Sequence, residues 1–296
     1  MARFDEIEGR NDRDGLDMSE NPPWLLVGLG LPKVIRLRDA ANWTVNNSNP
    51  GVVTMTVGEP PTRPERPIVL IPIGMGVSTI EARAPGGRQR IQLRVYTRPL
   101  VLHPIAFYFV RDQARPVAHQ TRRPQAEAAQ ILRRLNEIYY PQANILFNQI
   151  DLQSITLPGD FGPDIDLPRR EIDPSPEFAA VQSATEPGRV LGVRALHPAN
   201  HARVRVHFVW SIRRAGRASI DTEGCGTIGG DTVLVEDQLS ADAGTIVAHE
   251  VGHALGLQHR PSDRVRRGWL MYPHIQGLGT FIPKRHVDIL NPATTI

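Results

Sequence analysis

The sequence predicts an α+β chain of two domains, an N-terminal β-sandwich followed by an α/β domain with a mixed sheet. Three observations lead to this prediction. Short alternating apolar runs separated by turn residues fill residues 23–99, as is typical of a β-sandwich. From residue 100 to residue 296, strand-like and helix-like segments alternate, which indicates helices packed on a sheet. The length of 296 residues accommodates two such domains.

The first 22 residues are predicted to be a mobile tail, because they contain few large apolar side chains and show no period. The segment 1–20 also lacks the apolar stretch of a Sec-type signal peptide. We therefore expect a cytoplasmic protein, a protein exported by a route that needs no such signal, or one whose signal has been removed.

The predicted sandwich contains four strand patterns in which apolar and polar side chains alternate. Turn residues rich in Pro and Gly separate them, for example at 49–51 and 85–87. These strands cover residues 34–38, 52–57, 68–71 and 91–96. The segments 34–57 and 76–83 resemble bacterial immunoglobulin-like domains, which implies that fold for residues 23–99.

The second domain is predicted to alternate strands with helices. The segment 125–140 has apolar residues near a 3.6 period, so we expect an amphipathic helix that Pro141 ends. The segment 158–190 is rich in Pro, Asp and Gly and should be a long surface insertion. A helix of small and apolar residues is predicted over 241–257. Strands are expected at 105–110, at 204–212, at 232–236, and once or twice within 145–157.

The composition argues against several classes of protein. The net charge is +3, and the basic residues are almost all Arg, interspersed with Asp and Glu, so we expect a solvated surface and no nucleic-acid partner. No run approaches the roughly 18 apolar residues of a membrane span. The single cysteine, Cys225, allows neither an intramolecular disulfide nor a four-cysteine zinc site.

The most informative segment is AHEVGHALGLQH. His249 and His253 are four residues apart on the predicted helix, so both imidazoles project from one face and can bind one tetrahedral zinc ion. Glu250 is placed to act on a water activated by the metal and not to ligate the ion. Gly256 permits a positive φ at the end of the helix, so the chain can turn and bring His259 back as the third ligand.

HEVGHALGLQH resembles the extended zinc motif of the metzincin metallopeptidases, and GLQH followed by LMYP is especially similar to the matrixins. The resemblance implies that residues 100–296 form a metzincin-like catalytic domain with one zinc ion. Met271 matches the methionine of the turn beneath the metal, where its thioether would form a hydrophobic floor under the histidines. Tyr272 and Pro273 would line the pocket for the residue that follows the scissile bond.

GCGTIGGDTVLVEDQ resembles the short edge strand along the rim of the metzincin cleft, where an extended substrate can pair with the sheet. This resemblance implies a strand at Cys225–Gly230, with Thr227, Ile228 and Gly229 contacting substrate. A glycine-rich hairpin is the alternative and stays open. The Arg-rich loop 260–270 is longer than the corresponding matrixin spacing, so the resemblance identifies the superfamily and not one family.

These features together predict a zinc-dependent endopeptidase that hydrolyses internal bonds of proteins or peptides with Glu250 as general base. The alternative is a zinc-containing binding or structural protein without turnover. A structural site needs no general base and usually closes its fourth position with a protein ligand, so Glu250 favours the enzyme. We expect the N-terminal sandwich either to bind a surface partner or to cover the cleft.

The remaining histidines and the cysteine are weaker candidates. Pro198 separates His197 from His201, which makes a ligand helix improbable there. His207 lies in an apolar strand and is interpreted as a core histidine. The Cys225 thiol is interpreted as buried and not as a regulatory ligand of the metal.

Overall fold

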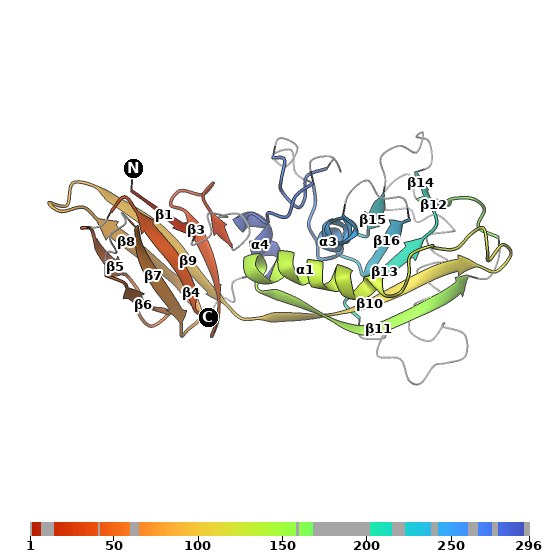
Figure 1. Cartoon of the computed structure of the whole chain (residues 1–296), viewed down its shortest axis with the longest axis horizontal. Coiled ribbons are helices and arrows are strands. Elements are labelled where there is room, and N and C mark those ends of the chain that lie inside the picture. The colour runs from red at the N-terminus through yellow and green to blue at the C-terminus, as the bar shows by residue number, and fades with distance from the viewer. Residues whose placement is uncertain are drawn as a thin grey trace. The chain divides into compact units, whose positions relative to one another are not determined.

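The computed structural model describes residues 2–6, 15–40, 42–59, 65–157, 160–167, 202–214, 223–237, 242–259, 266–273 and 278–292. These residues form several β-sheets and a small number of helices, so the chain is α+β (Figure 1). The chain divides into two compact units. Unit 1 contains Met1–Val101, Ile138–Leu146 and Thr280–Ile296, and unit 2 contains Leu102–Glu137 and Phe147–Gly279.

Unit 1 is built on two sheets whose inner faces share one hydrophobic core. The first sheet has the order β1-β4-β7-β6, with bounds Arg3–Glu6, Lys33–Arg38, Glu65–Pro72 and Val53–Val57. The second has the order β2-β3-β9-β8-β5, with bounds Leu16–Asp17, Trp24–Gly28, Arg90–Arg98, Gly76–Arg83 and Thr44–Asn47. Alternate residues of β4 and β9, such as Ile35 and Val95, are fully buried in this core. The four strand predictions are thereby confirmed.

The N-terminal residues differ from the predicted mobile tail. Arg3–Glu6 pairs antiparallel with β4, and Leu16–Asp17 pairs antiparallel with β3. Phe4 and Leu16 supply the physical reason, because both side chains are buried in the core between the sheets. Two isolated apolar residues in a polar segment show no period, so the sequence pattern gave no sign of these short strands.

The C-terminal helix α4 (Lys284–Leu290) belongs to unit 1, although it was expected in a single domain with residues 100–283. Buried Arg98, at the end of β9, donates to the carbonyl oxygens of Val287 and Asn291 and pairs with Asp288. Arg98 thereby satisfies the carbonyl of Asn291 and gives a second donor to that of Val287, which also accepts the N–H of Asn291.

Helix α1 spans Glu127–Ala143, so Pro141 does not end it as predicted. Side-chain amides explain why the last turn persists around a proline. Gln142 donates to the carbonyl oxygens of Ile138 (2.8 Å) and Thr280 (2.7 Å), and Asn291 donates to that of Ala143 (2.9 Å). The bonds to Thr280 and from Asn291 join residues distant in sequence, and together with the bond to Ile138 they offset the bond that proline cannot make.

Unit 2 contains a five-stranded mixed sheet of order β11-β10-β13-β16-β15 (Figure 1). Its strands are Ile145–Leu157, Val101–Asp112, Val204–Val209, Thr232–Glu236 and Gly224–Gly226. β13 is parallel to both β10 and β16, whereas the edge strand β15 is antiparallel to β16. Helix α3 (Ala243–Ala254) packs on β13, β15 and β16. A separate two-stranded sheet pairs β12 (Ile165–Leu167) with β14 (Ile212–Arg214).

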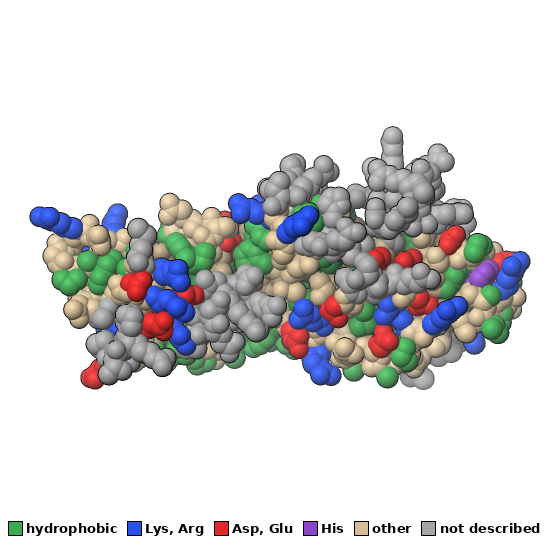
Figure 2. Space-filling view, turned by 45° about the horizontal axis from the view of Figure 1, so that its top comes forward, with side chains coloured by type: hydrophobic (Ala, Val, Ile, Leu, Met, Phe, Trp, Pro, Cys, Tyr) green, Lys and Arg blue, Asp and Glu red, His purple; other side chains and the backbone are tan. Residues whose placement is uncertain are grey.

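The described surface mixes charges of both signs. In Figure 2, basic and acidic side chains lie close to one another over both units, as the interspersed Arg, Asp and Glu of the sequence indicate. Among the described residues, no helix is long and apolar enough to cross a membrane.

Candidate metal centre

Helix α3 carries two of the three predicted ligands and is firmly capped at its start. Asp242 is the N-cap, and its carboxylate accepts hydrogen bonds from the backbone N–H (3.0 Å) and hydroxyl (2.8 Å) of Thr245. The helix ends at Ala254, and Gly256 then adopts a φ of +98°. The predicted positive φ at Gly256 is thereby confirmed, and the chain turns immediately after the helix.

The three predicted histidines converge in unit 2. The Nε2 atoms of His249 and His259 are 3.0 Å apart, and the ring centroids of the three imidazoles are 4.7 to 5.0 Å apart. His249 and His253 are only 7% and 9% exposed, whereas His259 is exposed. The site is therefore buried on the helix side and open to solvent on the side of His259.

Two backbone carbonyls orient the helical imidazoles. His249 Nδ1 lies 2.6 Å from the carbonyl oxygen of Leu270, and His253 Nδ1 lies 2.8 Å from that of Leu257. A carbonyl oxygen only accepts hydrogen bonds, so each Nδ1 carries the hydrogen and each Nε2 keeps its lone pair. Burial, helped by the neighbouring His253, lowers the pKa of His249 to about 3. The neutral imidazole is the form that binds metals.

This donor set fits a zinc ion. One nitrogen from each histidine lies within 4.8 Å of the others. A tetrahedral zinc ion with bonds of about 2.0–2.1 Å places its ligand nitrogens roughly 3.3 Å apart, close to the 3.0 Å between His249 and His259. Two imidazole nitrogens at that distance share either a proton or a cation, so the spacing is compatible with a metal between them.

Glu250 lies beside the histidines and against the edge strand. Glu250 is 8% exposed. A Cβ atom added to Gly224 would lie 2.8 Å from Cγ and 3.0 Å from Oε1 of Glu250. A Cβ atom on Gly226 would lie 2.3 Å from the backbone oxygen of Glu250 and 3.0 Å from the Cβ of His253. Strand β15 can approach α3 this closely because glycine occupies both positions that face the helix.

The expected edge strand is shorter than predicted. Gly224–Gly226 forms β15, while Thr227, Ile228 and Gly229 lie in the turn that joins β15 to β16. The alternative of a glycine-rich hairpin therefore describes the same segment equally well. The N–H of Gly229 donates to the carbonyl oxygen of His253 (2.9 Å), which fixes the turn to the end of α3.

Arg203 clamps the same two elements from the other side. Its guanidinium donates to the carbonyl oxygen of Gly230 in the turn (2.6 Å) and to that of Ala254 at the end of α3 (3.1 Å). The planar fork of arginine suits two acceptors at once. Arg203 therefore holds the β15–β16 turn next to His253.

The turn with the predicted methionine also contacts the histidines through its backbone. Leu270, whose carbonyl meets His249, directly precedes Met271, and Met271 is fully buried. The N–H of Tyr272 donates to the carbonyl oxygen of Trp269 (3.1 Å) and closes the turn. Tyr272 is 7% exposed and Pro273 is half-buried.

Other histidines and the cysteine lie away from this group. Cys225 packs with the apolar cluster on the face of the sheet opposite α3. His207 faces that cluster too, and burial lowers its pKa to about 4, which confirms its interpretation as a core histidine. His286 lies in α4 of unit 1. His197, His201, His274, residues 168–190 of the predicted insertion and residues 260–265 of the Arg-rich loop lie outside the described residues.

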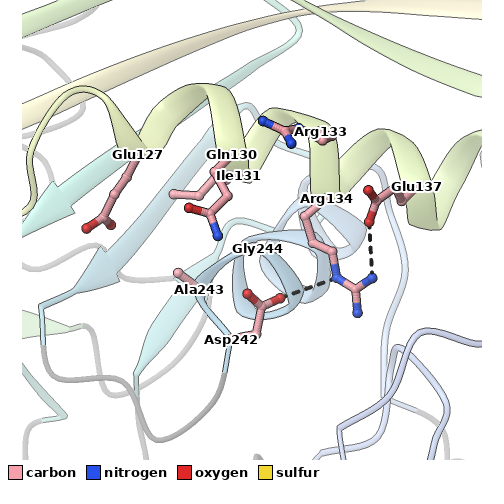
Figure 3. Close-up of a pocket in the computed structure, with 9 residues that line it drawn as sticks. All are labelled: Glu127, Gln130, Ile131, Arg133, Arg134, Glu137, Asp242, Ala243 and Gly244. Carbon is pink, nitrogen blue, oxygen red and sulfur yellow. Dashed lines mark hydrogen bonds and ion pairs between the residues drawn. The ribbon is translucent and has the colours of Figure 1, made fainter.

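The other end of α3 borders a pocket of about 440 Å³ (Figure 3). None of the predicted site residues lines it. Arg134 of α1 projects across it, with its Nε 3.3 Å from Asp242 and its guanidinium also paired with Glu137. A Cβ atom on Gly244 would lie 2.5 Å from the Cβ of Arg134, so the two helices touch here. The residues around the pocket thus hold the start of α3 against α1.

Three residues that shape the site were not predicted from the sequence. Gly224 and Gly226 alternate around Cys225, and alternating glycines in a strand are a readable sign of close backbone approach. Arg203 gives no such sign, because an arginine before an apolar strand is common and its two acceptors lie 27 and 51 residues away. Only the tertiary structure brings these acceptors together.

No family model and no curated protein matches the chain. Among solved structures, domains 4 and 5 of the S-layer protein SbsC match at 17% identity over 25% of this chain and 46% of that chain, with a TM-score of 0.21. The titin domains z1z2 in complex with telethonin match at 8% identity over 36% of this chain and 56% of that chain, with a TM-score of 0.20. The chain thus spans less than two thirds of either structure. At these TM-scores the similarities carry no functional information.

Proposed function

We propose that the chain is a zinc-dependent endopeptidase of the metzincin type, with unit 2 as its catalytic unit. The observation that carries the proposal is the convergence of three histidines, His249, His253 and His259, beside the buried residue Glu250. The backbone carbonyls hold the hydrogen of His249 and of His253 on Nδ1, so the Nε2 atom of each is unprotonated, as a ligand site requires. If the motif had arisen by chance, there would be no reason for two backbone carbonyls to orient its histidines.

The reaction would divide between the metal and the chain. When bound, zinc would supply a water of lowered pKa and polarise the scissile carbonyl. Glu250 would accept a proton at its carboxylate from the attacking water and return it to the nitrogen of the leaving amine. Packing against Gly224 restricts the Glu250 side chain, which limits the reorganisation needed for this transfer.

Substrate would bind in an extended form along β15. This strand is the last in its sheet among the described residues, so its outer edge can pair with the backbone of a peptide. Thr227, Ile228 and Gly229 continue this rim, and Tyr272 and Pro273 would line the pocket after the scissile bond. The two-sheet unit 1 would be immunoglobulin-like and would bind a surface partner or cover the cleft.

The test compares wild-type protein with Glu250→Gln at matched zinc content. We expect unchanged zinc per chain and a loss of cleavage of roughly 100- to 10,000-fold, because only the proton acceptor is removed. Cleavage is measured by mass spectrometry of new N-termini in a peptide library derived from unfolded proteins. His259→Ala is the control that should instead weaken zinc binding.

Two outcomes would contradict the proposal. Undiminished cleavage by the zinc-loaded Glu250→Gln variant would exclude the general-base role. If the zinc-loaded wild type cleaved no member of the library, the chain would be a zinc-containing binding or structural protein without turnover.

A further inference from the structure

A second group of possible metal ligands lies in unit 2, where β10 ends. Asp112, the last residue of β10, is fully buried, and His119 is 6% exposed. The N–H of Asp112 donates to the carbonyl oxygen of His119 (2.8 Å), and that of Thr121 donates to Val110 (2.9 Å). The loop therefore returns on itself and holds the two side chains together, with Asp112 Oδ2 2.7 Å from His119 Nδ1.

A third ligand comes from the segment that follows β11. Asp160 Oδ1 lies 3.8 Å from His119 Nδ1, and the three candidate ligand atoms all lie within 4.8 Å of one another. The N–H of Gly162 donates to Asp160 Oδ1 (3.0 Å), which fixes the carboxylate locally. The N–H of Gln113 donates to the carbonyl oxygen of Leu157 (2.9 Å), so the two segments are also joined through their backbones.

The imidazole is held in one plane, and the site has a path to solvent. The ring of His119 stacks on that of Trp210, with centroids 5.6 Å apart and an interplanar angle of 13°. The side chain of Asp160 is 45% exposed. Two ligands are thus preorganised by burial, while the third can close over an ion that enters from water.

The charges around the group favour a cation. Two carboxylates face one imidazole, and Asp112 is fully buried, where a carboxylate charge is costly unless a positive group lies beside it. Asp112 Oδ1 also accepts the N–H of Arg115 (2.6 Å), and the Arg115 Nε lies 3.4 Å from Asp160 Oδ2. That guanidinium is 62% exposed, so moving it away from Asp160 costs little.

We propose that Asp112, His119 and Asp160 bind a divalent transition metal ion, separate from the ion proposed at the three histidines. One imidazole nitrogen and two carboxylate oxygens suit Zn²⁺ or Mn²⁺, with water in the remaining positions. The ion fastens the loop after β10 to the segment after β11, so its role is structural. The proposal does not depend on peptidase activity.

The test counts zinc ions per chain in wild type, Asp160→Asn, His259→Ala and the double variant, after EDTA treatment and reloading with Zn²⁺. Asp160→Asn is chosen because its exposed side chain can change without disturbing the buried pair of Asp112 and His119. By inductively coupled plasma mass spectrometry, we expect about two zinc ions in the wild type, one in each single variant and none in the double variant. The zinc affinity of the altered site should fall at least tenfold.

The thermal shift gives a second readout. Zn²⁺ should raise the Tm of His259→Ala, and Asp160→Asn should abolish that rise, whereas the nearby control Asp164→Asn should keep it. If His259→Ala binds no zinc, or if Asp160→Asn changes neither count nor Tm, the cluster is an ion pair and the proposal is wrong. If the wild type bound a single ion that Asp160→Asn removes and His259→Ala leaves in place, the result would instead count against the proposed function.

Discussion

At the residue scale, the candidate centre depends on backbone carbonyl oxygens as well as on the side chains of the ligand motif. The carbonyl oxygens of Leu270 and Leu257 set the tautomers of His249 and His253, so each imidazole is oriented by a turn outside α3. Ligand geometry is therefore sensitive to backbone shifts of the surrounding turns and strands. Replacing Gly226 with alanine adds one methyl group at a close contact between β15 and α3, so this substitution can impose such a backbone shift.

Gly226→Ala should damage the site without changing any ligand. The added Cβ would lie 2.3 Å from the backbone oxygen of Glu250, which cannot yield as a flexible side chain would. Strand β15 must then move away from α3, at a cost of about 1–3 kcal/mol of overpacking. We expect a lower free energy of unfolding in urea and faster loss of zinc to a chelator.

A matched glycine provides the control for this variant. In Gly51→Ala, the new Cβ would meet Asn49 Oδ1 at 3.5 Å, an ordinary contact distance, and zinc release should not change. Unchanged zinc release in Gly226→Ala would show that the packing of β15 on α3 does not position the ligands.

The residues of the motif were predictable because they are local. His249, His253 and Glu250 lie within one helical turn of each other, and Gly256 with its positive φ explains how His259 returns. The carbonyl partners of the imidazoles were not predictable, since Leu270 lies 21 residues from His249 and every residue offers a carbonyl. Side-chain type therefore carries no information about these contacts.

At the element scale, Arg203 connects the β15–β16 turn to α3. Arg203→Ala should free two carbonyl acceptors and cost about 1–3 kcal/mol for each one left unsatisfied. The turn carries the proposed substrate contacts, so we also expect KM to rise more than kcat falls. The measurement is steady-state kinetics on a peptide cleaved by the wild type.

Arg203→Lys should recover only part of this loss, because an ammonium group lacks the planar fork that reaches both acceptors. Arg133→Ala is the control, since Arg133 is exposed on α1 of the same unit. Equal values of KM for Arg203→Ala and Arg133→Ala would contradict a role for the clamp in positioning the turn.

The elements with a clear period were predicted well, and those governed by distant contacts were not. The helix over 241–257 and the strand at 232–236 correspond to α3 and β16. The end of α1 was misplaced, because Pro141 is a local stop signal that the amide bonds of Gln142 override. β15 was predicted too long, because the positive φ at Gly229 ends it in a turn.

At the scale of the whole molecule, unit 1 is not a contiguous domain. Its sheets come from the first 101 residues, yet α4 and the segment Ile138–Leu146 belong to the same unit. The ammonium group of Lys284 lies 5.2 Å from the ring centroid of Tyr96 in β9. The Tyr96 ring also contacts that of Trp24. A boundary at residue 99 follows from the change of pattern in the sequence, but no pattern reveals which strand face a later helix covers. Deleting residues 1–98 would therefore remove the partners of α4 as well as the sandwich.

Arg98 offers a direct test of this arrangement. It is 3% exposed, and Arg98→Ala should leave the carbonyl oxygen of Asn291 without this donor, at about 1–3 kcal/mol for a buried acceptor, whereas that of Val287 keeps the N–H of Asn291. We expect hydrogen exchange, followed by mass spectrometry, to speed up in α4 and in β9 together, because both belong to one cooperative unit. Arg94→Ala is the control, since Arg94 is exposed on the same strand. Faster exchange confined to α4 would show that the helix is an appendage that opens without the sheets of unit 1.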